Sequence, residues 1–299
     1  MTVLIAGGSG FLGTALARAL RADGHRASVL TRRPQRDGDI LWTTRPNDTT
    51  WRHAVDRADA VINLAGESIA GRRWTDDRKR AIRGSRIEAT VALVSAITAA
   101  ERPPRVFISG SAIGIYGVQG DDVVTEQSAP GSDFLADVCR DWETRAIEAS
   151  SLTRVVLLRS GLVLAREGGA LPQLALPFQM LMGGPVGTGR QYMSWISLED
   201  WIGLVRWAIT TTHVSGPLNL TAPAPVTNRE FAHVLGRVLH RPAFLPAPAF
   251  ALRLALGELA DALILGGQRV VPARAQALGY EFTHKALEDA LRDIYERRT

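Results

Sequence analysis

Lysine and cysteine are the two residue types that this chain of 299 residues has least of. Only Lys79 and Lys285 are lysine, so 33 of the 35 basic side chains are arginine, as a GC-rich genome would also produce. Cys139 is the single cysteine, which excludes an internal disulfide and argues against a cysteine zinc site. The six histidines show no ligand-like spacing, so no metal site is predicted. Any mechanism that needs a lysine therefore has two candidates.

Long apolar runs are also missing. The most apolar late stretch, residues 250–265, is interrupted by Arg253, Glu258 and Asp261 and is too short to span a bilayer. The first residues show neither the basic region nor the long apolar region of a signal peptide. These features predict a cytoplasmic protein that does not contact a membrane.

The net charge of +5 raises the question of a nucleic-acid partner. The arginines are scattered, however, and they do not alternate with the 7 Trp, 4 Tyr and 8 Phe as a stacking platform requires. We therefore expect a small-molecule substrate and no nucleic acid.

Short β-rich runs alternate with helical stretches in the first half of the chain. Strands are expected at 3–6, 27–31, 40–42, 60–64, 105–109 and 155–158, and helices at 11–22, 76–100 and 133–149. Near-continuous Val, Ile and Leu strands separated by helices are typical of a parallel sheet that is covered on both faces. The predicted class is α/β, with a doubly wound parallel sheet of the Rossmann type.

The texture of the sequence changes after about residue 165, where Gly and Pro become denser. Later helices are expected at 228–239, 249–263 and 285–297. The predicted organisation is a dinucleotide-binding Rossmann domain over 1–165, with a return segment at about 191–220, and a smaller, mostly helical domain over 166–190 and 221–299. The smaller domain would supply the second wall of a substrate cleft.

A glycine-rich turn follows the first predicted strand and opens the first helix. It has the pattern G-x-x-G-x-x-G, formed by Gly7, Gly10 and Gly13. Without Cβ atoms the backbone can approach a pyrophosphate, and the helix N-terminus offers free N–H groups and a positive dipole end. The turn, with Phe11 and Leu12 at the start of the helix, is therefore a predicted dinucleotide site, the alternative being a turn without a ligand.

The end of the second predicted strand indicates which dinucleotide is bound. An acidic residue about 20 positions after the glycines would bind the ribose 2′-hydroxyl of NAD. The chain has Arg32 and Arg33 there instead. A guanidinium can pair with a 2′-phosphate in bidentate fashion, which predicts NADP(H) as the cofactor. The assignment is firmer for Arg32 than for Arg33, and a solvated arginine pair is the alternative.

Several further strings resemble the extended short-chain dehydrogenase/reductase superfamily. Two expected strand ends match it, Asn63-Leu64-Ala65-Gly66 and Ser109-Gly110-Ser111-Ala112, and so does Tyr116-Gly117. More closely, the chain is similar to an atypical branch of epimerase family proteins, of the NAD-dependent epimerase/dehydratase type, which carries a C-terminal domain of unknown function. The strings that carry this closer resemblance are residues 63–69, 73–75, 85–90, 134–143, 193–196, 219–223 and 266–270.

The resemblance implies a Rossmann domain that binds NADP(H), with cofactor contacts at three strand ends. The residues implied there are Leu64, Ala65, Gly66, Ser109, Ser160 and Gly161. Members of the superfamily often dimerise through two long helices, which here correspond to about 76–100 and 133–149. A homodimer is therefore a further expectation.

The superfamily's usual catalytic pair, Tyr-x-x-x-Lys, does not occur in this chain. The residues four positions after the four tyrosines are Gly120, Ile196, His284 and Thr299. Alignment of Glu143 with the glutamate that often follows the motif puts Leu135 and Cys139 where Tyr and Lys belong. Chemistry through that pair is therefore not expected.

Three residues remain as catalytic candidates. Ser111 occupies the position of the superfamily's catalytic serine and could hydrogen-bond a substrate oxygen, unless it only caps a turn or helix. Tyr116 lies where the superfamily loop lines the cleft; its pKa should stay near ~10 without a lysine, so it is either a proton donor or a wall residue. Glu67 could orient a ribose or act as an acid, unless it is an exposed loop glutamate.

Three functions are compatible with these residues. The preferred one is an NADPH-dependent oxidoreductase that acts on a small organic substrate, with the proton delivered by Ser111, Tyr116 or a water. A non-catalytic sensor of NADP(H) is the main rival because the usual dyad is missing. A nucleotide-sugar epimerase or dehydratase is third, since it would normally need the same tyrosine.

Overall fold

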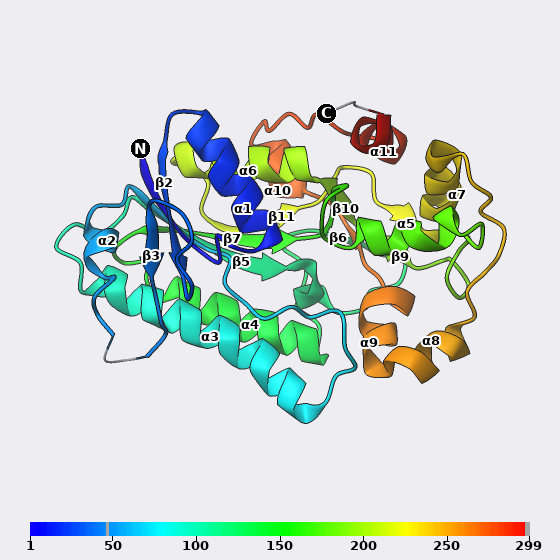
Figure 1. Ribbon diagram of the computed structural model, residues 1–299, viewed down its shortest axis with the longest axis horizontal. Helices are drawn as coiled ribbons and strands as arrows, with labels where there is room; N and C mark the ends of the chain where they lie inside the picture. The colour runs from blue at the N-terminus through cyan, green and yellow to red at the C-terminus, as the bar shows by residue number, and fades with distance from the viewer. Residues whose placement is uncertain (46–47, 297–299) are drawn as a thin grey trace.

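A seven-stranded parallel sheet forms the centre of the protein in this computed structural model, which describes residues 1–45 and 48–296 (Figure 1). The strand order across the sheet is β11-β7-β5-β4-β1-β2-β3. These strands are β1 (Thr2–Ala6), β2 (Arg26–Thr31), β3 (Asp39–Leu41), β4 (Ala60–Asn63), β5 (Val106–Ala112), β7 (Arg154–Ser160) and β11 (Gly216–Leu220). The predicted α/β class with a parallel, Rossmann-type sheet is confirmed.

Helices cover both faces of the sheet. The helices α1 (Phe11–Ala22) and α6 (Leu198–Thr210) lie on one face, and α3 (Asp76–Thr98) and α4 (Phe134–Ile147) lie on the other (Figure 1). The alternation within β1 explains the two cores. Val3 and Ile5 pack with the first pair of helices, whereas Leu4 and Ala6 pack on the α3 side. Because both faces of the strand are buried, its sequence is continuously apolar.

Short elements surround this sheet and were not expected from the sequence. Three two-stranded pairs form from β8 (Leu162–Leu164) with β10 (Trp195–Ser197), β9 (Tyr192–Met193) with β12 (Val226–Thr227), and β6 (Val123–Val124) with β13 (Arg269–Val270). The short helices are α2 (His53–Asp56), the 3₁₀ turn η1 (Ile113–Tyr116), α5 (Leu171–Gln179) and α10 (Ala273–Ala277). Strands of two or three residues are too short to show an alternating pattern.

The late helices agree with the sequence except at one glycine. The helix α7 (Asn228–Leu239) has the predicted bounds, and α11 (Leu287–Glu296) matches the prediction over 285–297, of which position 297 lies outside the described residues. The single helix predicted over 249–263 is wrong. It is divided into α8 (Ala249–Leu256) and α9 (Glu258–Ala260), followed by the π-helical turn η2 (Asp261–Leu265), because Gly257 adopts a φ of 62° that a helix cannot accommodate.

The end of the chain packs on both parts of the molecule. Ala275 and Phe282 belong to the same core cluster as Val3 of β1, whereas Leu287 and Leu291 pack around Trp195. The division into two domains stays a prediction, but the last segment joins the two cores.

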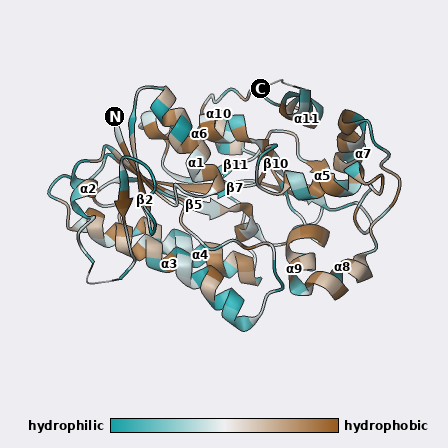
Figure 2. Ribbon diagram, in the orientation of Figure 1, coloured by the Kyte–Doolittle hydropathy of each residue, from teal (hydrophilic) through white to brown (hydrophobic). Residues whose placement is uncertain are grey.

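One late helix leaves its apolar residues exposed. The helix α8 carries hydrophobic residues (Figure 2) but buries none of them, and Phe250 and Leu254 are 73% and 77% exposed. None of the described helices is both long and apolar enough to cross a membrane. The cytoplasmic location stays a prediction.

Candidate functional site

The glycine turn lies at the carboxyl end of β1 and is built around two positions that only glycine can occupy. Gly7 has a φ of 78°, and a Cβ on it would lie 2.6 Å from the carbonyl carbon of Leu64. A Cβ on Gly13 would lie 2.3 Å from the carbonyl oxygen of Gly7. The backbone of the turn therefore packs closely against the residues that follow β4, and the first turn of α1 packs closely against the glycine turn.

The first turn of α1 leaves backbone donors without acceptors. Gly10 is the N-cap residue and has no side chain to cap the helix, and the first backbone bond of the helix runs from the N–H of Thr14 to the carbonyl of Gly10. The N–H groups of Phe11, Leu12 and Gly13 precede Thr14, the first residue whose N–H donates to a carbonyl of the helix. Three such donors at a positive helix end suit a phosphate or diphosphate group.

The order of the strands arranges the predicted contact residues around this turn. The order of chain connections reverses between β1 and β4, and ligands of open α/β sheets bind outside the carboxyl ends at such a reversal. Arg32 and Arg33 follow β2 on one side of it and are exposed. Leu64, Ala65 and Gly66 follow β4 on the other side.

The carboxylate of Glu67 is under the influence of three guanidinium groups, one of which contacts it. Arg78 donates to Glu67 at 2.8 Å, and the charges of Arg32 and Arg86 also act on this carboxyl. The hydrogen bond from Arg78 is the main reason that the pKa of Glu67 lies below its ordinary value. Glu67 is therefore an ion-paired carboxylate, which does not favour the predicted role as an acid. The excess of positive charge suits an anionic ligand.

Ser111 is the first member of a buried polar chain. Its hydroxyl donates to Glu143 Oε1 at 2.6 Å, and Arg159 donates to both oxygens of Glu143 at 2.8 Å. Burial opposes the charge of Arg159, but its hydrogen bonds and ion pair with Glu143 outweigh this, so its pKa is raised. The hydroxyl proton of Ser111 is thus used in the hydrogen bond to Glu143. The Ser111 oxygen can still accept a hydrogen bond from a ligand.

Tyr116 continues the same chain but has no exposed surface. Arg159 donates to the Tyr116 hydroxyl at 2.9 Å, and that hydroxyl donates to Asn219 Oδ1 at 2.7 Å. Burial raises the pKa of Tyr116 above its ordinary value, although the Arg159 charge opposes the shift. This geometry favours the alternative that Tyr116 shapes the site, and it does not favour proton donation by Tyr116.

The positions of the missing dyad on α4 carry no charge. Burial raises the pKa of Cys139 to about 11, with the Glu143 charge as a further cause, so its thiol is neutral near neutral pH. Leu135 packs near Gly114, where a Cβ would lie 3.4 Å away. The helix that usually provides both groups therefore provides neither.

Three other residues that were predicted to contact the cofactor already make contacts within the protein. Ser109 is fully buried in β5, and its hydroxyl donates to the carbonyl of Gly110 at 3.3 Å. Ser160, at the end of β7, accepts from the indole N–H of Trp201 at 3.0 Å. Gly161 follows it, and a Cβ there would lie 2.4 Å from the carbonyl of Ser194. Their contacts with a cofactor stay predictions.

Sequence reasoning assigned no role to Glu143 and Asn219, and it placed Arg159 only in the segment 159–161 expected to contact the cofactor, although these residues hold Ser111 and Tyr116 in place. Glu143 and Asn219 lie in the strings 134–143 and 219–223 that carry the family resemblance, and Arg159 precedes Ser160. These polar residues inside largely apolar elements were the available signal, because buried charges are normally paired.

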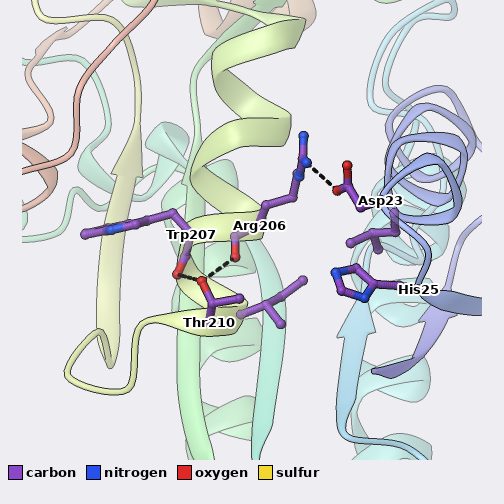
Figure 3. Close-up of a pocket in the computed structure, with 7 residues that line it drawn as sticks. Asp23, His25, Arg206, Trp207 and Thr210 are labelled. Atoms are coloured by element: carbon purple, nitrogen blue, oxygen red, sulfur yellow. Dashed lines mark hydrogen bonds and ion pairs between the residues drawn. The ribbon is translucent and has the colours of Figure 1, made fainter.

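A surface hollow of about 440 Å³ lies elsewhere (Figure 3). It is lined by Asp23 and His25 from the end of α1 and the start of β2, and by Arg206 and Thr210 from α6. Arg206 forms an ion pair with Asp23 (Figure 3). Because β2 begins here, the hollow lies at the amino end of the sheet, opposite the glycine turn. We therefore place the candidate site at the turn and not in this hollow.

Comparison with known proteins gives two family matches and close relatives along the whole chain. Residues 3–220 match the NAD dependent epimerase/dehydratase family, and residues 247–294 match a domain of unknown function, DUF1731. The chain is 44% identical to the epimerase family protein ML0860 of Mycobacterium leprae, over 97% of this chain and 94% of that protein. It is 42% identical to the chloroplastic epimerase family protein SDR39U1 homolog of Arabidopsis thaliana, over 99% and 87% of the two chains.

One solved structure is similar over the full length of both chains. It is the crystal structure of the human epimerase family protein SDR39U1 (isoform2) with NADPH, at 37% identity and a TM-score of 0.92, covering 100% of each chain.

Proposed function

Because the chain belongs to the NAD dependent epimerase/dehydratase family, we propose that it binds NADP(H) at the glycine turn and acts as an oxidoreductase on a small organic substrate. One observation carries this proposal. The chain combines a glycine turn against an uncapped helix N-terminus with Arg32 in place of the acidic residue that would bind NAD. The human relative solved with NADPH supports the same cofactor.

The residues of the turn would hold the cofactor by its anionic groups. The N–H groups of Phe11, Leu12 and Gly13 would bind the diphosphate, and Arg32 would pair with the 2′-phosphate. When bound, NADP(H) supplies or accepts a hydride. The chain's own residues then have to orient the substrate and move a proton.

Ser111 and Glu143 are the pair that we propose for that proton. Since the Ser111 hydroxyl donates to Glu143, its oxygen can accept a hydrogen bond from a substrate hydroxyl. As hydride leaves the carbon of such an alcohol, its hydroxyl proton can pass to Ser111 while the Ser111 proton passes to Glu143. The substrate becomes a carbonyl compound, and the reverse transfers reduce it.

The cofactor assignment predicts a selective effect of Arg32→Ala. Loss of a charge-assisted pair with the 2′-phosphate removes about 1.5–3 kcal/mol, which corresponds to at least about tenfold in affinity. Titration should show weaker NADPH binding by that factor and unchanged NADH binding. Arg36→Ala, a nearby exposed arginine, serves as the control. Equal effects of Arg32→Ala on both dinucleotides would contradict the assignment.

A sensor that binds NADP(H) without turnover is the second candidate, and one observation favours it. The hydroxyl protons of Ser111 and Tyr116 are both donated to groups inside the protein. A screen of alcohols, and of carbonyl, imine and enone compounds with NADPH, separates the two functions. Turnover of any compound that is lost in Ser111→Ala supports the oxidoreductase, whereas tight binding with no turnover across the panel supports the sensor.

A further inference from the structure

Arg86 on α3 lies beside the segment that follows β4. A Cβ on Gly66, just after β4, would lie 3.1 Å from the Cζ atom of Arg86. That Cζ atom is 5.3 Å from the ring centroid of Trp142, and the Trp142 ring in turn closes over Gly110 of β5, where a Cβ would be 2.8 Å away. The guanidinium therefore lies between the segment that follows β4 and the Trp142 ring of α4, which in turn covers β5.

The hydrogen bonds of Arg86 leave part of its guanidinium unused. Its Nη1 atom donates to the carbonyl oxygens of Glu67 at 3.0 Å and Ile82 at 2.9 Å. In the described part of the chain its other two nitrogens have no protein acceptor, and Glu67, the carboxylate that acts on its charge, is ion-paired with Arg78. Burial lowers the pKa of Arg86, because the cation loses solvation. Arg86 therefore keeps hydrogen-bond donors that a ligand at this place could use.

Arg86 also acts on the residue that replaces the missing lysine. Its charge acts on the Cys139 thiol, and both Arg86 and Ser111 favour the ionised form of that thiol and so oppose the rise of its pKa. Arg86 on α3 and Ser111 near the end of β5 thus both influence the thiol of Cys139 on α4. The charge of Arg86 is therefore felt at Cys139, the position on α4 where the superfamily usually has a lysine.

The sheet order indicates which half of a dinucleotide would meet this cation. Arg32 and the 2′-phosphate lie beyond β2, on one side of the reversal between β1 and β4, and Arg86 lies on the other side, at β4 and β5. A dinucleotide that crosses the reversal with its adenosine half over β2 must place its nicotinamide half there.

We propose that Arg86 replaces, from α3, the lysine that α4 lacks. Its free nitrogens donate to the hydroxyl oxygens of the nicotinamide ribose, and its charge lies beside Ser111. This inference rests on the proposed binding of NADP(H). It assigns a positioning role to a residue that lies outside the usual catalytic helix.

Paired titrations with a whole and a half cofactor test the proposal. Arg86→Met should weaken NADPH binding by about tenfold or more, the loss expected for hydrogen bonds from a charged group. It should leave the binding of adenosine 2′,5′-bisphosphate unchanged, because this ligand lacks the second ribose. Arg83→Met, which removes a half-exposed arginine paired with Asp141 one turn earlier on α3, should change neither. Thermal melting of each variant reports whether it is folded.

A double variant provides a second test. It should regain affinity for NADPH, which would not happen if Arg86 had only a structural role. Arg86→Met combined with Cys139→Lys should bind NADPH more tightly than Arg86→Met alone, since a lysine at 139 restores a cation at the same place. If Arg86→Met does not fold, Arg86→Lys replaces it in the test. Its binding of NADPH should be weaker than that of the wild type, and its binding of adenosine 2′,5′-bisphosphate should be unchanged.

Each other outcome counts against a specific claim. Equal weakening of both ligands by Arg86→Met would show that Arg86 only clamps the loop after β4, and no weakening of NADPH would remove it from the ribose site. A double variant no better than Arg86→Met would contradict the replacement of the lysine. If the wild type binds neither ligand, the proposed function itself fails.

Discussion

At the scale of single residues, the buried pair of Glu143 and Arg159 has most influence on the site. Both side chains are less than a tenth exposed, and Ser111 and Tyr116 are each bonded to one of them. The pair sets the direction in which each hydroxyl points, so it determines what Ser111 can offer a substrate. Sequence patterns located Ser111 and Tyr116, but they could not show this pairing, because it joins residues from four separate elements.

Removing one partner of this pair should lower the free energy of unfolding substantially. Glu143→Ala leaves the Arg159 cation buried without a counter-ion, and such losses destabilise by about 3–5 kcal/mol. Glu148→Ala is the matched control, since it breaks an exposed ion pair with Arg145 at the end of the same helix, which is worth at most about 1 kcal/mol. Urea unfolding of both variants measures the difference. Similar losses for the two would contradict the role given to the buried pair.

The thiol of Cys139 predicts a loss of stability in alkali. Its pKa is raised to about 11 in the folded protein, so the folded state holds this proton more tightly than the unfolded state does. The free energy of unfolding should therefore fall as pH rises from about 8.5, the ordinary cysteine pKa, to about 11. Urea unfolding as a function of pH tests this, and the fall should be smaller in Cys139→Ala. An equal fall in both proteins would exclude the thiol as a cause.

At the scale of elements, sequence patterns were informative where a strand or helix was long. The helices α1 and α7 have the predicted bounds because their apolar spacing and flanking residues are regular, and α7 begins with a full capping box at Thr227. The break at Gly257 could not be predicted in the same way. A glycine inside an apolar run is compatible with a continuous helix, and only its positive φ, set by tertiary packing, shows the division.

The glycine turn predicts a contrast between two glycine substitutions. Gly13→Ala places a Cβ 2.3 Å from the Gly7 carbonyl oxygen, so the turn must move and NADPH binding should be lost or weakened by more than about tenfold. Gly84→Ala in α3 has ordinary space beside Glu88 and should stabilise the helix by about 0.5–1 kcal/mol. Titration and thermal melting of both variants measure these effects. Unchanged binding in Gly13→Ala would contradict the site.

At the scale of the whole molecule, the last quarter of the chain belongs to the same packed structure as the sheet. Ala275 and Phe282 pack with the core beneath β1, and Asn219 of β11 is bonded to the carbonyl of Val271 at 3.0 Å. The sequence showed a change of texture after about residue 165, but it could not show that the C-terminal segment returns to the large core, because that packing is between distant parts of the chain.

This packing predicts a single unfolding transition. Chain 1–246, which lacks the region that matches DUF1731, should lose the cooperative transition, because the core would lose Ala275 and Phe282. Calorimetry of the full and shortened chains tests this. A shortened chain that melts cooperatively at the temperature of the full chain would show that the last region folds independently.

The most direct test of the account is a calorimetric titration of the wild-type protein with NADPH and with NADH in the same buffer. The account predicts one NADPH bound per chain, with an affinity at least about tenfold higher than that for NADH, because Arg32 meets a 2′-phosphate that NADH lacks. Binding of neither dinucleotide, or equal affinity for both, would contradict it.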